Sequence, residues 1–464
     1  MTRYFARRRA ALALLLAMAL ALLAACGGAP AAAPTAAPTA ATARENTAAQ
    51  ALKATAAPAA PAMPAATGVA AAEAAVVGDA AAPPPAASGA ADGVAAAAPI
   101  SAATSTNASA VRPLGQEAGL KAGEINDNDR FAAYLDYLQA YQGGGVRLAD
   151  VGERYLIRVI GDGQRPVIDA RVTIYADDQE IFHGRTYAGG QTIFLPRALG
   201  VSPNITRFRA VATYASASAE VSFDRSPGAS VEIGLRGVQP DSALRLDLLF
   251  LLDTTGSMGD ELGRIQQTID SIAQRIDAFT PRPQIRYGLV AYRDRGDDYV
   301  TRPVDFTTDL GQFRSALTQL AAAGGGDTPE AVDEAMYDAI MRASWSDQPA
   351  VRLVFLVADA GPHTDAQSQF TYLDGAREAT ARGVKIYPIA ASNSDAPAEY
   401  VFRQLAQQTM GGFVFLTYQP GQSAGAPGES TTLEAGDQPY SVERLDDLIV
   451  SIVERELAAA VGAR

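Results

Sequence analysis

Residues 248–258 read LLFLLDTTGSM, an uninterrupted apolar run that ends in a carboxylate, hydroxyl side chains and a glycine. Apolar residues without polar alternation indicate a strand that is buried on both faces. The spacing of Leu262, Ile265 and Ile269 immediately afterwards indicates an amphipathic helix. The polar cluster is therefore predicted at the carboxyl end of a central strand, which is where open α/β sheets place their ligand sites.

The chain from residue 243 onward alternates between strand-like and helix-like stretches. Strands are predicted at 245–252, 284–292, 299–305, 351–358, 384–391 and 412–416. Helices are predicted at 257–279, 309–322, 329–344, 366–382, 396–410 and 441–460. This alternation is typical of a parallel sheet that is covered by helices on both faces. We therefore predict an α/β fold class with a doubly wound, mostly parallel, six-stranded sheet.

The loop that follows the first of these strands has the composition of a metal site. Asp253, Thr255 and Ser257 alternate along it, so their oxygens can converge on one point. Hard oxygen donors that include a single carboxylate suit Mg²⁺, which takes near-octahedral oxygens at about 2.1 Å and keeps some of its waters. Mn²⁺ is the alternative ion, and Ca²⁺ is expected to fit less well.

The Asp-x-Thr-x-Ser spacing resembles the start of the metal-ion-dependent adhesion site of the von Willebrand factor type A (vWA) family. The resemblance covers about 240–462, and we take 243–462 as a Rossmann-like vWA domain. It implies two further site residues: Thr328, in the loop GGGDTPE, would reach the metal directly, and Asp359, at the end of an apolar strand, would act through water. With hydroxyls as direct ligands the metal keeps much of its positive charge. It can then take a carboxylate from a partner protein, which implies adhesion or another protein–protein interaction.

Two features beside this site have more than one interpretation. Asp260 and Glu261 resemble an adjacent second metal site of integrin β subunits, but acids in the first turn of a helix also meet the positive end of its dipole, which is the interpretation we favour. His363 follows Asp359 closely and is expected at the rim of the site. Because the chain has only 2 histidines, a histidine-based hydrolase or zinc site is not expected.

Residues 1–25 have the pattern of a secretory signal peptide, with a cationic start, an apolar run and small residues before Cys26. The segment LAAC at 23–26 resembles the lipobox of bacterial lipoproteins, which implies that Cys26 carries a lipid anchor. A simple membrane anchor is the alternative. Cys26 is the only cysteine, so no intramolecular disulfide can form. We therefore predict a lipid-anchored, extracytoplasmic protein at the cell membrane, exposed on the cell surface.

The stretch 26–112 is rich in Ala, Pro and Thr and nearly devoid of charged and aromatic residues. Such a composition buries too little apolar surface to offset its ordering entropy, so a disordered stalk is predicted. Removal of the signal arginines would lower the net charge from −13 to −17. A surface of that charge repels nucleic acid, and no nucleic-acid partner is expected.

Two further segments precede the vWA-like region. Residues 113–145 are predicted as a short helical segment whose acidic run before Phe131 caps the helix; a calcium site there lacks the glycine and glutamate of an EF-hand. Residues 146–238 contain short β-rich runs between glycine turns, which indicates an antiparallel, Ig-like β-sandwich. His183 is interpreted as a surface histidine on a strand of this sandwich.

The leading hypothesis is a membrane-anchored lipoprotein whose vWA domain binds an acidic side chain of a protein ligand through a divalent metal. The alternative is a cell-envelope scaffold or assembly protein in which the metal mainly stabilises the vWA loops. An enzyme would need a perturbed acid and base pair beside a nucleophile, and the sequence contains no such pair. The identity of the ligand and the oligomeric state do not follow from the sequence.

Overall fold

The computed structural model describes residues 120–462 apart from 240–242, 327, 392–393 and 418–441. The predicted signal peptide, Cys26 as the predicted lipidation site and the predicted stalk at 26–112 lie outside the described residues. Within the described part of the chain, no helix is both long enough and apolar enough to cross a membrane. The described residues form an eight-stranded sheet, a four-stranded sheet and a three-stranded sheet.

The eight-stranded sheet has the strand order β11-β10-β9-β12-β13-β14-β1-β15. Its consecutive parallel strands are β10 (Gln284–Tyr292), β9 (Arg245–Asp253), β12 (Val351–Ala358), β13 (Val384–Ala390) and β14 (Phe413–Thr417). At one edge, β11 (Thr301–Thr307) is antiparallel to β10. The prediction of a mostly parallel sheet in an α/β fold is therefore confirmed.

Two strands of this sheet were not predicted, so the expected number of six was wrong. β1 (Lys121–Ile125) comes from the segment expected to be helical, and it lies antiparallel between β14 and β15 (Val442–Arg444). A sheet edge exposes unpaired backbone groups that another strand can satisfy. The amino-terminal segment therefore completes a sheet whose other strands lie far along the chain.

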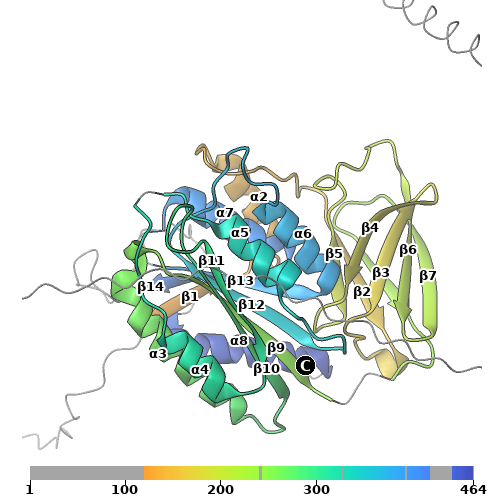
Figure 1. Cartoon of the computed structure of the whole chain (residues 1–464). Coiled ribbons are helices and arrows are strands. Elements are labelled where there is room, and N and C mark those ends of the chain that lie inside the picture. The colour runs from red at the N-terminus through yellow and green to blue at the C-terminus, as the bar shows by residue number, and fades with distance from the viewer. Residues whose placement is uncertain (1–119, 240–242, 327, 392–393, 418–441, 463–464) are drawn as a thin grey trace, which may run out of the picture. The chain divides into compact units, whose positions relative to one another are not determined.

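Helices cover both faces of the sheet (Figure 1). One face carries α3 (Gly259–Asp277), α4 (Leu310–Thr318) and α8 (Leu445–Ala460), and the other carries α5 (Val332–Tyr337), α6 (Tyr372–Arg382) and α7 (Ala396–Gln408). Side chains of β9 alternate accordingly, since Leu248 and Phe250 belong to the core around α3, and Leu249 and Leu251 to the opposite core. Burial of each such side chain contributes about 1.5–3 kcal/mol, so this one strand stabilises both layers.

The acidic run before α2 (Phe131–Ala140) does not cap that helix, which corrects the prediction. Arg130 occupies the N-cap position, and no side chain caps the helix there. Asp127 instead lies buried and forms two hydrogen bonds with the guanidinium of Arg403 on α7, at 2.6 and 3.0 Å. The acidic run therefore stabilises the tertiary structure, because Asp127 forms an ion pair with a residue that lies 276 positions further along the chain.

Residues 155–234 form a β-sandwich that differs from the expected one in a single pairing. One sheet has the order β5 (Gln191–Phe194), β2 (Tyr155–Ile160), β8 (Ser230–Gly234). The other has the order β4 (Gln179–Arg185), β3 (Arg171–Ala176), β6 (Arg207–Tyr214), β7 (Ala217–Asp224). β2 and β8 are parallel, so the sandwich is not wholly antiparallel. His183 lies on β4 with an exposed side chain, as predicted.

A buried ion pair joins the sandwich to the large sheet. Asp169, which precedes β3, accepts hydrogen bonds from both terminal nitrogens of Arg352 on β12, at 2.8 and 3.2 Å, and both side chains are buried. A second contact joins the sandwich to α6, because the hydroxyl of Tyr187 lies 3.0 Å from that of Thr380. A bidentate pair shielded from water has both geometric and electrostatic specificity. The sandwich is therefore held against the α/β domain at defined positions.

Candidate metal centre

The loop after β9 gathers three of the predicted site residues. Asp253 Oδ1 accepts hydrogen bonds from the backbone nitrogen of Thr255 at 2.9 Å and from its Oγ1 at 2.6 Å. Thr255 Oγ1 in turn lies 3.1 Å from Ser257 Oγ. Asp253 and Thr255 are buried, whereas Ser257 is exposed in a short 3₁₀ turn, Gly256–Met258. The alternation in the sequence thus places a carboxylate and two hydroxyls side by side, with the outermost one open to solvent.

The glycine-rich loop at 323–326 lies directly against this turn. Gly256 donates its backbone N–H to the carbonyl of Gly324 at 3.0 Å, and Ala323 donates to the carbonyl of Thr254 at 3.1 Å. Asp297 holds the loop from outside, because its carboxylate accepts the N–H of Gly325 at 2.8 Å. Gly324 has a φ of 75°, and a Cβ at this position would collide with the Asp297 carboxylate. Only glycine allows this approach of two loops.

Asp359 brings a second carboxylate to the site from the end of β12. It is buried, and burial raises its pKa, while a hydrogen bond with Ser257 opposes that rise. Burial, followed by the charge of Asp359, raises the pKa of Asp253 to about 7. Hydrogen bonds thus join Asp253, Thr255 and Ser257, and Asp359 acts on this cluster through its charge and its hydrogen bond with Ser257.

Thr328 is the one predicted residue that is not joined to this cluster by a hydrogen bond or by an electrostatic effect on its acids. Its side chain is exposed, and among the described residues it makes no hydrogen bond with the other four. The peptide bond between Thr328 and Pro329 is cis, and Glu330 follows with a buried side chain. The loop therefore directs its glutamate, rather than its threonine, into the protein.

Glu330 is a site residue that the sequence analysis missed. Burial raises its pKa to about 9, and the nearby charges of Asp253, Asp294, Asp359 and Asp297 contribute in that order. Its backbone nitrogen donates to the carbonyl of Gly361 at 2.9 Å, which ties it to the loop after β12. The one signal in the sequence was an acid directly after a proline in a loop already assigned to the site.

The polar atoms of this cluster fit a hard divalent cation. Asp253 Oδ2, Asp359 Oδ1 and Glu330 Oε2 are buried and have no hydrogen-bond partner among the described residues. Buried oxygens of this kind are normally satisfied, and carboxylates with hydroxyls and water are the donors that Mg²⁺ or Mn²⁺ takes. Within the part of the chain that the structure describes, no group of three His, Cys, Asp or Glu has metal-binding geometry by itself. A metal here would therefore depend on the hydroxyls of Thr255 and Ser257 as well.

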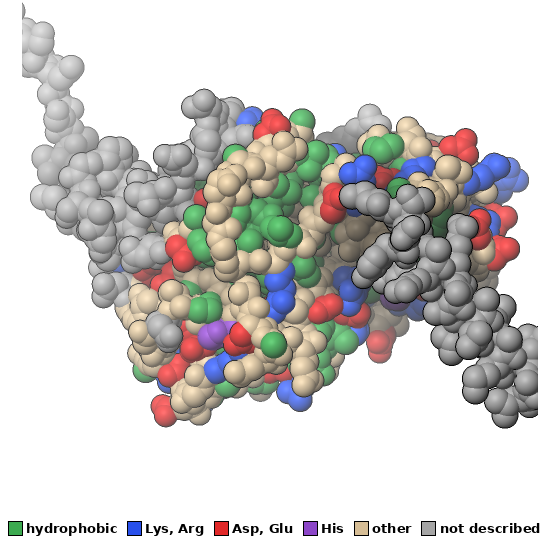
Figure 2. Space-filling view, turned by 90° about the horizontal axis from the view of Figure 1, so that it is seen from above, with side chains coloured by type: hydrophobic (Ala, Val, Ile, Leu, Met, Phe, Trp, Pro, Cys, Tyr) green, Lys and Arg blue, Asp and Glu red, His purple; other side chains and the backbone are tan. Residues whose placement is uncertain are grey.

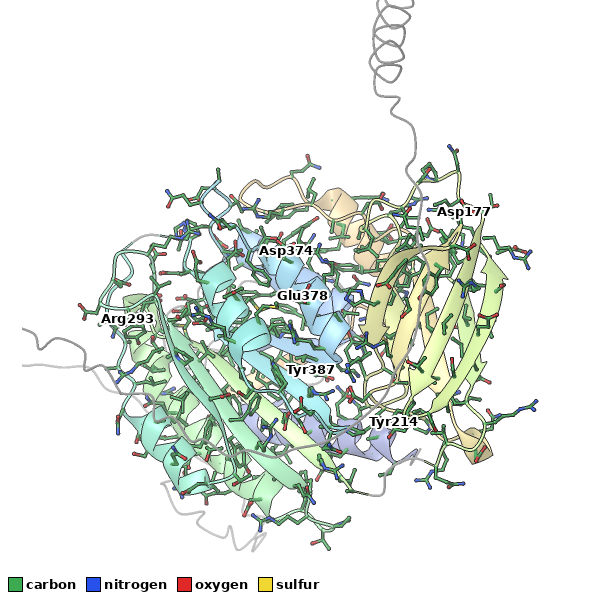
Figure 3. The ribbon with its side chains drawn as sticks, turned by 45° about the vertical axis from the view of Figure 1, so that its right-hand side comes forward. Asp177, Tyr214, Arg293, Asp374, Glu378 and Tyr387 are labelled. Carbon is green, nitrogen blue, oxygen red and sulfur yellow. The ribbon has the colours of Figure 1, made fainter. Side chains whose placement is uncertain are left out.

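The rim of the site is formed by charged residues after β10. His363 Nε2 lies 2.6 Å from Asp294 Oδ1, so the histidine expected at the rim is engaged with an acid there. Arg293 stacks on Tyr299, with 4.5 Å between the guanidinium carbon and the ring centroid. Figure 3 shows Arg293 among the loops on the side of the sheet away from the sandwich. In the view from above, acidic and basic side chains are interspersed around an apolar area (Figure 2).

The second metal site considered at Asp260 and Glu261 stays a prediction. The side chain of Asp260 lies outside the described residues. Glu261 is buried in the first turn of α3 and has an interaction partner within the protein.

The raised pKa values predict how stability depends on pH in the metal-free protein. The folded state favours the protonated forms of Asp253 and Glu330. The contribution of each acid to folding stability is therefore complete below its unfolded pKa. It is lost as the pH rises toward about 7 for Asp253 and toward about 9 for Glu330. A metal needs the ionised carboxylates, so Mg²⁺ should stabilise the protein more at about pH 8 than at about pH 5. Melting temperatures with EDTA and with Mg²⁺ at both values test this. An equal effect of Mg²⁺ at the two pH values would contradict the assignment of these carboxylates.

The fold and the site together define an α/β domain with a hydroxyl-and-carboxylate centre at the carboxyl ends of its parallel strands. Residues 247–418 match the family model described as the von Willebrand factor A domain. The chain therefore contains a vWA domain, and the match spans the strands from β9 to β14.

Several relatives share part of this region. von Willebrand factor A domain-containing protein 7 of Rattus norvegicus is 34% identical over 115 residues, which are 25% of this chain and 12% of that protein. Hemicentin-1 of Homo sapiens is 35% identical over 83 residues, which are 18% of this chain and 1% of that protein. The chain thus spans a small part of the length of these relatives.

Solved structures include proximal thread matrix protein 1 from the mussel byssus, with a TM-score of 0.31 and 13% identity over 48% of each chain. A further structure of that protein, described with a zinc-occupied MIDAS motif, has a TM-score of 0.28 and 14% identity over 36% of this chain and 43% of that one.

Proposed function

We propose that this protein is a membrane-anchored, extracytoplasmic lipoprotein whose vWA domain binds a partner protein through Mg²⁺ or Mn²⁺. The observation that carries the proposal is the set of three buried carboxylate oxygens without partners, beside the hydroxyls of Thr255 and Ser257. These three oxygen atoms have no hydrogen-bond partner among the described residues, and a divalent cation with its bound waters would satisfy them.

The residues that would hold the metal are Thr255, Ser257 and Thr328, with Asp253 and Asp359 acting through water. A bound divalent cation would supply a positive charge that attracts a carboxylate of the partner. Ser257 and Thr328 are exposed, so the outer side of the site is accessible to such a group.

The same arrangement favours binding over catalysis. Asp253 Oδ1 is already engaged by Thr255, and His363 is engaged by Asp294 rather than by a nucleophile. A hydrolase needs a base within hydrogen-bond reach of its nucleophile, and the group beside the Ser257 hydroxyl is the carboxyl of Asp359, to which we assign a role toward the metal through water. We propose that the protein is not an enzyme and that its partner is a protein with an accessible acidic side chain.

The anchor belongs to the proposal because of the amino-terminal pattern. Two or more acyl chains on Cys26 would hold the protein stably on a membrane, whereas one chain would hold it marginally. The Ala/Pro/Thr-rich stretch at 26–112 would then separate the vWA domain from the membrane surface, where it can meet partners.

Thr255→Val tests the binding function directly, because it keeps the shape of the side chain and removes its hydroxyl. We expect partners captured from a surface-protein extract in Mg²⁺ to be lost both in EDTA and with the variant. Thr268→Val is the matched control, since Thr268 lies on α3 and its hydroxyl donates to the carbonyl of Arg264, away from the site. Capture that is indifferent to EDTA and to Thr255→Val would contradict the proposal.

The scaffold alternative predicts a different pattern in the same experiment. The loops at 254–256 and 323–324 already hold each other through backbone hydrogen bonds, and a metal could serve mainly to brace them. Chelation would then lower the melting temperature without releasing any captured protein.

A further inference from the structure

A basic crevice lies between the sandwich and α6, away from the metal centre. It has a volume of about 250 Å³, and it is lined by Arg171, His183 and Arg185 of β3 and β4 and by Glu378 and Arg382 of α6. Figure 3 shows α6, which carries Glu378, beside the strands of the sandwich. The crevice shares no residue with the metal centre. Three arginines around a small cavity are unexpected in a chain with a net charge of −13.

The strand register brings two of these arginines face to face. Arg171 on β3 pairs directly with Arg185 on β4, and both belong to the outer side of the sheet, opposite Val172 and Gly184. Side chains directly opposite in an antiparallel pair have Cβ atoms about 4.5–5.5 Å apart, and like charges in this position destabilise the sheet. The pairing therefore carries an electrostatic cost unless negative charge lies between the two guanidinium groups.

The carboxylates of the protein neutralise Arg171 and Arg185 only in part. Arg185 lies 3.1 Å from Asp169, but the same carboxylate is bound by both terminal nitrogens of the buried Arg352. Within the described part of the chain, no carboxylate pairs with Arg171. One acid is thus shared between two guanidinium groups, and a third has none.

The cation on α6 is also weakly compensated. The closest nitrogen–oxygen distance between Arg382 and Glu378 is 3.9 Å, which is longer than a hydrogen bond. Arg382 Nε is buried and has no hydrogen-bond partner among the described residues. A buried guanidinium N–H of this kind costs free energy until an acceptor reaches it.

A larger cleft elsewhere in the domain lacks these properties. It has a volume of about 870 Å³ near the start of β9 and β10, and its lining includes Arg282, Arg286 and Arg245, the last of which has an interaction partner within the protein. Asp247 accepts two hydrogen bonds from Arg286, at 2.6 and 2.8 Å, and Arg282 pairs with Asp277. Arg282 and Arg286 of this cleft thus each have a carboxylate partner, whereas in the basic crevice Arg185 shares Asp169 with Arg352 and no carboxylate among the described residues pairs with Arg171.

We propose that the basic crevice is a binding site for a small oxyanion, namely phosphate or sulfate, free or as a monoester. The planar guanidinium matches two oxygens of such a group at once, and three arginines, Arg171, Arg185 and Arg382, line this one cavity. The cavity exceeds the volume of a water molecule severalfold, so it has room for the anion and for the first atoms of an attached group. The anion offsets the repulsion between Arg171 and Arg185.

The experiment titrates the full chain with inorganic phosphate, inorganic sulfate and glycerol phosphate at constant ionic strength, with heat of binding and melting temperature as readouts. Wild type should bind at least one of them saturably. Arg171→Gln and Arg382→Gln should each weaken binding about fivefold or more, as expected when a charge-assisted hydrogen bond is lost. Stronger binding of glycerol phosphate than of phosphate would identify a monoester as the ligand, and the reverse would identify the free ion.

Two control measurements separate specific binding in the crevice from general charge effects and from misfolding. Arg207→Gln removes an exposed arginine of the same sheet and should leave binding unchanged. Without anion, Arg171→Gln should melt at a higher temperature than wild type because the facing charges are gone, which a variant that merely misfolds would not do. Absence of saturable binding, or equal binding by Arg171→Gln and Arg207→Gln, would overturn the proposal.

Discussion

Asp253→Asn is expected to abolish the stabilisation of the protein by Mg²⁺ and to raise the melting temperature of the metal-free protein. The asparagine keeps an oxygen to accept the hydrogen bonds of Thr255 and replaces Oδ2, which has no partner among the described residues, with an uncharged donor group. It also removes one of the charges that repel Asp359 and Glu330 in the absence of metal. The two effects have opposite signs, and only a metal site predicts both.

The measurement is the melting temperature at about pH 8 with EDTA and with saturating Mg²⁺. At about 100 times its dissociation constant, a ligand stabilises the folded state by about 2.7 kcal/mol, and this is the gain that the variant should lose. Asp224→Asn is the matched control, since Asp224 is an exposed acid of the sandwich. A variant that keeps the full response to Mg²⁺, or that is less stable than wild type in EDTA, would argue against a metal at Asp253.

The central part of the fold could be predicted because its signals are local. The apolar runs of β9 and β12 have too few polar residues for any half-exposed element, and the stripe of Ile265, Ile269 and Ile272 can face only a core. Chain order and the alternation of strands and helices then leave few topologies. The site residues Asp253, Thr255 and Ser257 could be predicted for the same reason, because they lie within one short stretch of sequence.

β1 could not be predicted because its signal is not local. The strand reads KAGEI and contributes only Ala122 and Ile125 as buried apolar side chains among its described ones. Its stability comes from backbone pairing with β14 and β15, about 290 residues away or more, and no property of the five residues reports those partners. The preference of an amino acid for a strand depends more on its packing against neighbouring residues of the sheet than on the residue itself.

Glu330 and Asp127 show the same limit for charged residues. An acid before a helix or after a proline is adequately accounted for by capping or solvation, and each sequence context supports that interpretation. Glu330 is instead turned into a site shared with Asp253, and Asp127 into a pair with Arg403. The role of an acidic residue depends on whether it is buried. Burial depends on which helices and strands pack against the residue, and the local sequence does not contain that information.

Residues outside the family match pack against the matched region. The match at 247–418 omits β1, α2 and the sandwich, yet β1 lies within the sheet and Asp169 binds Arg352 on β12. β12 carries Arg352 near its start and ends just before Asp359 of the metal centre. These segments therefore contact a strand that ends just before a site residue, although they lie outside the family match.

Arg403→Ala is the substitution expected to cost the most stability. The side chain of Arg403 is 2% exposed and that of Asp127 is 3% exposed, and Glu399 lies 3.1 Å from the same guanidinium. The guanidinium also covers the ring of Tyr137 on α2 at 3.7 Å. Truncation leaves two buried carboxylates without this cation, and loss of one partner of such a pair costs about 3–5 kcal/mol.

The measurement is the free energy of unfolding by denaturant for Arg403→Ala, Asp127→Ala and the double variant. The double variant should be more stable than the sum of the two single losses predicts, because it leaves one buried carboxylate, Glu399, instead of two. Arg377→Ala is the matched control, since Arg377 is an exposed arginine on α6 that pairs with Asp374 and should cost about 0–1 kcal/mol. Additive losses would show that Asp127 and Arg403 act independently. In that case β1 and α2 would be held to the domain by the sheet pairing and apolar contacts alone.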